Sequence, residues 1–250
     1  MTVKTAGLSL LVSALFIGCG GSGNDNKTDL DATVAFKSAG TYDLKEYLTP
    51  SVNSINIYDE QTFTNKDGKK RFNDDPEKST YTEKYDINAS GVTVYDGQDN
   101  VEERYIIRQD RILSLDENGD PQREISRYAD VGDYVLSTTV TDSDGPAPVT
   151  HKMVCRVTNH LSDKMVGNVT YNDVLEVSCI GKGAGKSEGS NLSIVIEDES
   201  TNTNFFAKDI GMISSESISC DQVETVLNGE STKQGTCTKE VDTLIGHNTL

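Results

Sequence analysis

The chain has 250 residues, of which 40 are acidic and 23 are basic, so its formal net charge at pH 7 is −17. This charge excludes proteins that hold nucleic acid by electrostatic attraction, because the phosphates would be repelled. Hydrophobic residues make up 35% and charged residues 25%, which is low for a helical bundle but sufficient for a sheet with one solvated face. The length allows one large domain or two small ones.

The N-terminus has the features of an export signal. Lys4 supplies a positive charge, residues 6–17 form an apolar stretch, and Gly18 is a small residue suited to cleavage. A helix over this stretch would span about 18 Å, which is too short for a hydrocarbon core of about 30 Å. The sequence therefore predicts a signal peptide over residues 1–18 and no transmembrane helix there.

The residues at the cleavage point carry a resemblance to a known signal. Leu15-Phe16-Ile17-Gly18-Cys19 is similar to the lipobox of bacterial lipoproteins. The resemblance implies that Cys19 begins the mature chain and carries acyl chains that anchor the protein to a membrane. Gly20, where an aspartate would favour the inner membrane, implies the outer membrane of a Gram-negative bacterium. The alternative is ordinary secretory cleavage followed by release.

Residues 19–38 have the composition of a tether. Residues 20–26 are only Gly, Ser, Asn and Asp, which bury no apolar surface, and a flexible stretch of this length reaches roughly 25 Å. Residues 39–250 are then expected to form a β-rich domain, with a boundary between two halves near residues 142–148. An acidic domain on a flexible tether is expected to stand off from anionic lipid headgroups.

Four cysteines remain once Cys19 is assigned to lipid, and they allow three pairings. Asn228-Gly229 is a strong signal for a two-residue hairpin turn, because both positions tolerate positive φ. Such a turn places Cys220 directly opposite Cys237, and it also sets Glu224 against Lys233 as a favourable charge pair. The register therefore predicts a Cys220–Cys237 disulfide.

The second pair follows from the faces of two strands. In residues 153–157 and 175–179, alternation places Cys155 and Cys179 on the apolar face of each strand. The sequence therefore predicts a Cys155–Cys179 disulfide, and in the chain-entropy model each bridge contributes roughly 3 kcal/mol. The chain has no CxxC motif or spaced histidines, so no metal and no cofactor are expected.

Further turns and alternating runs predict an all-β fold. A two-residue loop at Asp67-Gly68 would pair Phe63 with Phe72, and one at Asn118-Gly119 would pair Ile112 with Ile125. Strands are expected over residues 54–65, 80–87, 91–95, 101–115, 134–141, 149–158, 169–180, 192–197 and 204–214. Residues 43–48 favour one or two helical turns before a proline. The expected fold is an antiparallel meander of sequential hairpins that forms a curved open sheet or a sandwich.

A second resemblance covers residues 171–177 and 205–213. Tyr171-Asn172-Asp173-Val174-Leu175-Glu176-Val177, followed by Phe205-Phe206-Ala207-Lys208 and a glycine-bearing strand, is similar to a pattern in exported bacterial proteins of unassigned function. The resemblance implies a β-rich module and carries over no catalytic residue.

Three groups of residues could suggest functional motifs but do not meet their requirements. Residues 181–187, Gly-Lys-Gly-Ala-Gly-Lys-Ser, lack the spacing of a phosphate-binding loop, so an exposed hairpin loop is expected, in which Lys182 and Lys186 could contact an anion or a partner. His151, His160 and His247 form no catalytic motif, and they are expected at the surface or at strand edges. The acidic runs at residues 116–120 and 142–145 are expected to be Asx turns, with weak calcium binding as the alternative.

Three functions remain open from the sequence. The first is a non-catalytic, lipid-anchored envelope protein with a structural or interaction role, which has the membrane and an envelope protein as partners and no nucleic acid. The second is a module that binds a lipid or another apolar ligand in a cavity of the curved sheet. The third is a hydrolase that uses paired carboxylates, although no pair can be nominated.

Overall fold

Short connections join most of the strands of this protein. The computed structural model describes residues 29–72, 75–143, 147–189 and 192–250. The elements are β1 (Tyr42–Asp43), α1 (Lys45–Leu48), β2 (Ser54–Asn65), β3 (Glu77–Asn88), β4 (Gly91–Tyr95), β5 (Val101–Ile107), β6 (Arg111–Leu115), β7 (Pro121–Ser126), β8 (Tyr128–Ala129), β9 (Tyr134–Asp142), β10 (Val149–Val166), β11 (Val169–Glu188), β12 (Leu192–Ala207), β13 (Gly211–Leu227) and β14 (Glu230–Thr249). The signal peptide and Cys19 lie outside the described residues.

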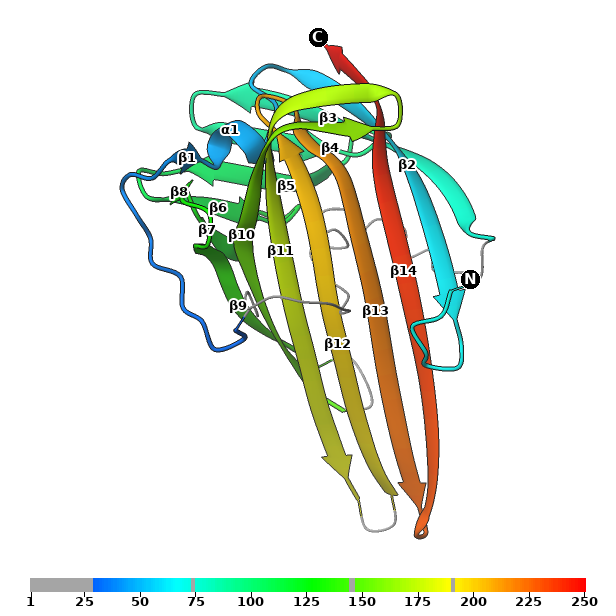
Figure 1. Ribbon diagram of the computed structural model, residues 1–250. Helices are drawn as coiled ribbons and strands as arrows, with labels where there is room; N and C mark the ends of the chain where they lie inside the picture. Colours follow the sequence, from blue (N-terminus) through cyan, green and yellow to red (C-terminus); the bar gives the residue numbers. More distant parts are fainter. Residues whose placement is uncertain (1–28, 73–74, 144–146, 190–191) are drawn as a thin grey trace.

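Twelve strands form one antiparallel sheet in the order β7-β6-β5-β4-β3-β2-β14-β13-β12-β11-β10-β9. Within each half of the sheet, β2–β7 and β9–β14, strands that are neighbours in the chain are also neighbours in the sheet, and the pairing of β14 with β2 joins the two halves. The sheet curves until its end strands, β7 and β9, approach each other (Figure 1). The predicted curved antiparallel sheet is confirmed. A sandwich does not form in the described residues, since the other sheet consists of β1 and β8 alone.

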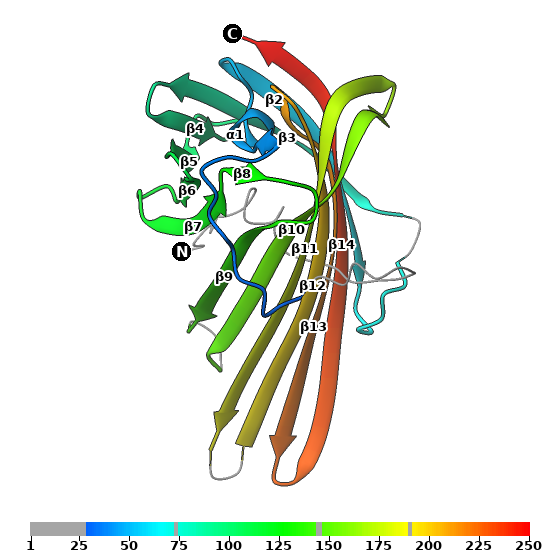
Figure 2. The same ribbon diagram turned by 60° about the vertical axis from the view of Figure 1, so that its left-hand side comes forward.

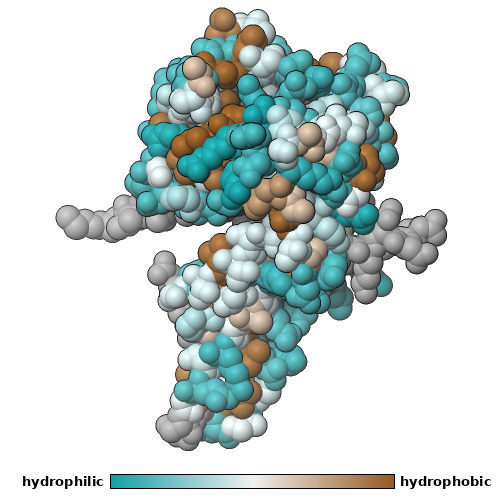
Figure 3. All heavy atoms as spheres, turned by 90° about the vertical axis from the view of Figure 1, so that its left-hand side faces the viewer, coloured by the Kyte–Doolittle hydropathy of each residue, from teal (hydrophilic) through white to brown (hydrophobic). Residues whose placement is uncertain are grey.

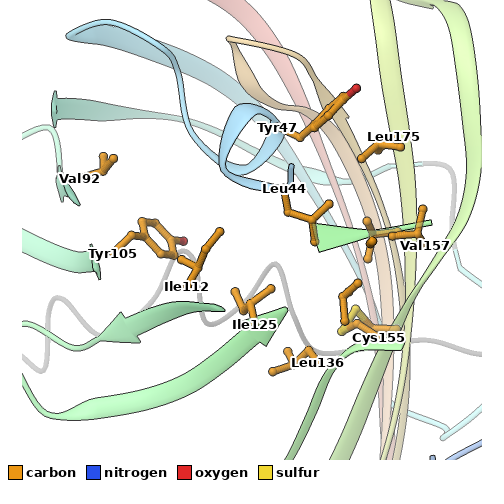
Figure 4. Packing of buried hydrophobic residues seen from close by; sticks show 14 of the residues in the cluster. Leu44, Tyr47, Val92, Tyr105, Ile112, Ile125, Leu136, Cys155, Val157 and Leu175 are labelled. Atoms are coloured by element: carbon orange, nitrogen blue, oxygen red, sulfur yellow. A yellow bond between two sulfur atoms is a disulfide. The ribbon is translucent and has the colours of Figure 1, made fainter. Parts of the chain in front are cut away.

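The apolar core lies inside this curve. It contains side chains from both halves of the sheet, among them Val92, Tyr105, Ile112, Leu136, Cys155, Val157 and Leu175 (Figure 4). Leu44 and Tyr47, from α1 and the residue before it, are 2% and 3% exposed and cover one end of the core. The Tyr47 hydroxyl donates a 2.6 Å hydrogen bond to Asp173 on β11, which ties the predicted short helix to the sheet.

Strands β10 to β14 are longer than the others and continue past the core (Figure 2). At the helix end, the β10–β11 hairpin contributes Val166 and Tyr171 to a second apolar cluster with Ile213. At the opposite end, the β11–β12 and β13–β14 hairpins project beyond the short strands. The molecule narrows between its upper body and these hairpins (Figure 3). Because Asp142 pairs with Val149, the strands on both sides of residues 143–148 belong to the same sheet.

The two disulfides join the cysteine pairs that the sequence predicts. Asn228 and Gly229 have φ of 52° and 88°, and the resulting turn sets Cys220 opposite Cys237 and Glu224 opposite Lys233. The Cys220–Cys237 bond is formed with a Cα–Cα distance of 4.1 Å. The Cys155–Cys179 bond has a Cα–Cα distance of 4.0 Å, and both of its residues belong to the apolar core.

The prediction of one strand over residues 204–214 is wrong, because β12 ends at Ala207 and β13 begins at Gly211. Three further predictions in the first half of the sheet are also wrong. Phe63 and Phe72 do not pair, because β2 follows β14 to its end while β3 begins only at Glu77, and the connection passes over β14 with Gly68 against Gly235. Residues 101–115 form two strands, because a turn closes from the Arg108 N–H to the Arg111 carbonyl.

The third of these incorrect predictions concerns the turn at Asn118-Gly119. Its closing pair is Asp116 and Asp120, so the loop has three residues and not two, and only Gly119 has positive φ. A bulge after Ser114 compensates for the extra residue. Ile112 therefore still pairs with Ile125, as predicted.

Candidate functional site

Alternating glycines in β11 shape the inner face of the sheet. Residues 181–187 were expected as a hairpin loop, but they lie within β11, and the loop comes after Glu188. Gly181, Gly183 and Gly185 share the inner face with Cys179, because side chains alternate along a strand. Glycine is poor in strands and often marks a close approach of other groups. A close approach of neighbouring groups therefore explains why glycine alternates along this part of β11.

A close contact between a histidine and an aspartate crosses β11 over one of these glycines. His151 on β10 and Asp198 on β12 both oppose Gly183, one from each side. The Asp198 carboxylate reaches across the glycine to His151 Nδ1, at 3.1 Å. A Cβ atom at Gly183 would overlap this carboxylate. The absence of a side chain at residue 183 therefore lets two strands that do not pair bring an acid and a base together.

Asp221 adds a second carboxylate beside this pair. It lies directly opposite Asp198 in the β12–β13 register, an unfavourable position for two like charges. Burial, and then the charge of Asp198, raise the pKa of Asp221 above its usual range. Both carboxylates line a cavity of about 440 Å³.

We call this space the seam cavity, because it lies where β7 and β9 face each other. Its walls are Gln122, Arg123, Thr138, Val140, Asp142, His151, Asp198, Glu199, Ser200, Ser219 and Asp221. In the described residues no strand pairing joins β7 to β9, so the sheet is open along this line. Its size is within the range of small-ligand sites, and most of the residues that line it are polar or charged. The cavity can thus hold a polar or cationic group.

Replacing Gly183 by Ala is expected to destabilise the fold by roughly 1–3 kcal/mol, because the new methyl group must displace the Asp198 carboxylate from His151. Urea denaturation measures the loss. The same substitution in an Asp198→Ala background should cost much less, since the overlap is gone. Gly97→Ala is the control, because a Cβ there meets only Thr82 at an ordinary distance of 3.7 Å. Equal costs in both backgrounds would refute the arrangement.

Two buried asparagines follow Asp198 and Ser200 on the inner face of β12, beyond the seam cavity. Asn202 and Asn204 are each 1% exposed, on the same face as Ser200. Among the described residues, neither the amide nitrogen nor the oxygen of Asn202 has a hydrogen-bond partner, and the Asn204 oxygen has none. Buried polar groups are nearly always satisfied, so these amides mark a place where water or a bound group completes the structure.

Buried carboxyl groups on the short strands form a second polar cluster. Glu83 is 1% exposed and accepts a hydrogen bond from the Tyr85 hydroxyl. Burial raises its pKa to about 8, although the Tyr85 hydrogen bond opposes the shift. Glu103 is bound by the Ser114 hydroxyl and, at 2.9 Å, by the Tyr105 hydroxyl. Burial likewise raises the pKa of Glu103. This cluster is not predicted from the sequence, although alternation places Glu83 on the face of Tyr85.

The other singled-out residues do not converge on the seam cavity. His160 Nε2 lies 2.7 Å from Asp173, and His247 Nδ1 lies 2.7 Å from the Asn56 side-chain oxygen. Lys182 lines a groove of about 470 Å³ that also contains Cys220, and Lys186 pairs with Glu188. Of the three histidines, His151 alone lines the cavity.

The acidic run at residues 116–120 is an Asx turn, as expected. Asp116 accepts backbone hydrogen bonds from Asn118 at 2.9 Å and Asp120 at 2.8 Å. Asp144 and Gly145 of the other run lie outside the described residues. In the described ranges, no group of three or more His, Cys, Asp or Glu side chains is placed to hold a metal ion. Within the same ranges, no helix has the length and apolar character needed to cross a membrane.

The apolar core offers little room for a ligand. The cavity between α1 and the inner face of β9–β12 measures about 40 Å³ and is bordered by Leu44, Tyr47, Cys155 and Phe206. A cavity of about 150 Å³ is needed for a molecule the size of benzene. This core space is therefore too small for an acyl chain.

Comparisons with known proteins add little to this geometry. No family model matches the chain, and no curated protein matches it. Among solved structures, the chain is similar to OmpT (in-vitro folded), an outer membrane protein of Vibrio cholerae, with 10% identity over 79% of this chain and 99% of that chain. The TM-score is 0.21, and a similarity of this size carries no argument about function.

Proposed function

We propose that this protein is a lipid-anchored envelope protein with a non-catalytic interaction role, and that it binds its partner at the seam cavity. The observation that carries the proposal is the open line between β7 and β9, which exposes a cavity of about 440 Å³, lined in part by Asp198 and Asp221, beside the apolar core. An opening of this kind gives a partner access to inward-facing side chains without unfolding the core.

Two features support a location outside the cytosol. Both cysteine pairs are oxidised, and structural disulfides persist in oxidising compartments such as the periplasm. The lipobox resemblance at residues 15–19 supplies the anchor, and the formal charge of −17 keeps the tethered domain away from anionic headgroups. The outer membrane is the proposed site of attachment, because Gly20 follows Cys19.

Intact-mass spectrometry of the membrane-extracted protein tests the anchor. The expected mass lacks residues 1–18, includes the acyl chains on Cys19, and rises by two hydrogen atoms for each of the two disulfides on reduction. A Cys19→Ser variant should leave the membrane fraction, because each buried CH₂ contributes about 0.8 kcal/mol to anchoring. Retention of residues 1–18, or sedimentation of the variant with membranes, would contradict the proposed anchor.

Photo-crosslinking from single positions tests the interaction role. A photoreactive residue at Val140, which is 48% exposed in the seam cavity, should give a discrete adduct in intact envelopes. The matched control is Val52, which is 49% exposed and does not line the cavity. Equal labelling from both positions, or none from Val140, would count against the seam cavity as the binding surface.

A carboxylate-dependent hydrolase is the second candidate, favoured by the opposed Asp198 and Asp221 in one cavity. Directly opposed residues have Cβ atoms about 4.5–5.5 Å apart, which is compatible with the close spacing of a general acid and a nucleophilic carboxylate in retaining glycosidases. The raised pKa of Asp221 suits a general acid. Hydrolysis of glycosidic substrates that disappears in Asp221→Asn, with stability retained, would favour this candidate over a purely binding role.

A further inference from the structure

The lower half of β9 is an unprotected sheet edge. β9 pairs with β10 on one side, and in the described residues it has no strand partner on the other. Thr139, Val140, Thr141 and Asp142 are exposed, although Asp29 and Asp31 contact Tyr134 and Lys152 nearby. Proteins commonly block such edges with lysine, proline or a bulge, and residues 137–141 contain none of these. The edge is therefore competent to pair with another strand.

The alternation of backbone hydrogen bonds along β9 shows which residues direct their N–H and C=O groups away from β10, toward the unpaired edge. The Cα–Cα distance of 4.0 Å between Cys155 and Cys179 marks a pair without mutual backbone hydrogen bonds, so the backbone groups of Cys155 point toward β9. Counting along the β9–β10 register, Thr138 and Val140 bond to β10, whereas Thr139 and Thr141 direct their N–H and C=O groups outward. The 3.1 Å contact between the Thr141 and Thr150 hydroxyls agrees with this phase.

The inner face beside this edge carries an excess of carboxylates. Thr138, Val140 and Asp142 of β9 line the seam cavity together with Asp198 and Asp221. The basic groups in the same cavity are Arg123 and His151, and His151 is paired with Asp198. A strand added to β9 would direct alternate side chains to this inner face. A cationic side chain there would relieve the repulsion between the opposed Asp198 and Asp221.

A buried amide lies beyond the seam cavity on the same face of β12. Asn202 is two residues beyond Ser200 on the inner face of β12, is 1% exposed, and has no hydrogen-bond partner among the described residues. Its unused donors and acceptor lie at the upper end of the column that Asp198 and Ser200 begin.

We infer that the free edge of β9 binds an extended segment of a partner protein by strand addition, with a lysine or arginine side chain of that segment in the seam cavity. This inference rests on the proposed interaction role and names the chemistry of the partner. Main-chain bonds to Thr139 and Thr141 supply affinity, while the carboxylates of Asp198 and Asp221 select a basic side chain. The formal charge of −17 favours encounter with a basic segment.

The test uses the full mature protein and two synthetic peptides. In both peptides threonine and valine alternate, and the central residue is lysine in one and glutamate in the other. Wild-type protein should bind the lysine peptide at least about tenfold more tightly, with a difference that shrinks as salt is added. Asp221→Asn should reduce this preference severalfold and leave the affinity for the glutamate peptide unchanged or higher.

The backbone contribution has its own pair of variants. Thr139→Pro removes one outward N–H without breaking a bond to β10, and it should weaken the lysine peptide about tenfold or more. Thr139→Ser keeps the N–H and should bind like wild type. Thermal melts and intact disulfides verify that both variants are folded. Wild-type affinity in Thr139→Pro, or equal affinity of wild type for both peptides, would overturn the inference.

Two further outcomes separate this inference from the proposed function. If wild type binds neither peptide while crosslinking from Val140 still gives an adduct, strand addition is overturned and the interaction role stands. If Thr139→Pro converts a wild-type dimer to a monomer in sedimentation, the edge pairs with a second copy of this chain, and the inferred basic partner is overturned.

Discussion

Glu83→Gln is expected to stabilise the protein at pH 8 by on the order of 3 kcal/mol, a rise in melting temperature of roughly 6–12 °C. The Glu83 carboxyl is buried, which raises its pKa from 4.5 to about 8. The folded state therefore keeps a proton that the unfolded state releases above pH 4.5. The stability contributed by this group is complete below pH 4.5 and is lost as pH rises toward 8. Glutamine resembles the protonated acid and can still accept the Tyr85 hydrogen bond.

Thermal melts from pH 4.5 to pH 8 measure this effect. The gain over wild type should grow with pH and be small at pH 4.5. The stability of the Glu83→Gln variant should still depend on pH, because burial also raises the pKa of Asp242 to about 6. Glu230→Gln, at an exposed residue, removes the same charge and is the control. An equal shift in both variants would mean that net charge, and not burial of Glu83, is responsible.

Replacing all four domain cysteines by alanine is expected to cost about 6 kcal/mol, or about 3 kcal/mol for each pair. The disulfides close segments with sequence separations of 24 and 17, which restrict the unfolded chain to a similar extent. Single domains have a total stability of only about 5–15 kcal/mol, so a large fraction of this variant should be unfolded at 37 °C. Urea denaturation of the two double variants and of the quadruple variant measures the costs.

The two bridges differ in what surrounds them. Cys155 and Cys179 are each 1% exposed within the apolar core, so their removal also leaves unfilled space there. Cys220 borders the groove on the other face of the sheet. The Cys155→Ala/Cys179→Ala variant should therefore lose somewhat more stability than Cys220→Ala/Cys237→Ala. A quadruple variant with wild-type stability would show that the sheet needs neither bridge.

Local sequence signals predicted the strands best where one short segment contains all the information. Asn228-Gly229 fixes both φ angles of its turn, and the register then follows by counting to Cys220 and Cys237. The turn at Asp67-Gly68 does not close a tight hairpin, because β3 begins only at Glu77 and pairs with β2 up to Thr62, while the last three residues of β2 pair with β14 alone. Turn residues predict a turn, but they do not predict which strand lies next to it.

The candidate site was less accessible to such reasoning. Gly181, Gly183 and Gly185 suggested a loop because glycine is rare inside strands, and only the neighbouring strands show why it is needed. The contact between His151 and Asp198 joins residues 47 positions apart on strands that do not pair. A signal was nevertheless present, since the three glycines alternate with longer residues at the period of a strand.

By itself, the sequence determined the β class, most strand positions, the helical turn at α1 and both cysteine pairs, because each depends on alternation or on one turn. Only the tertiary structure decided that the sheet curves until β7 meets β9, which carboxyl groups are buried, and that Asp198 crosses Gly183 to reach His151. Alternation shows which residues share a face. The curvature of twelve strands decides which face becomes the interior and which side chains converge there.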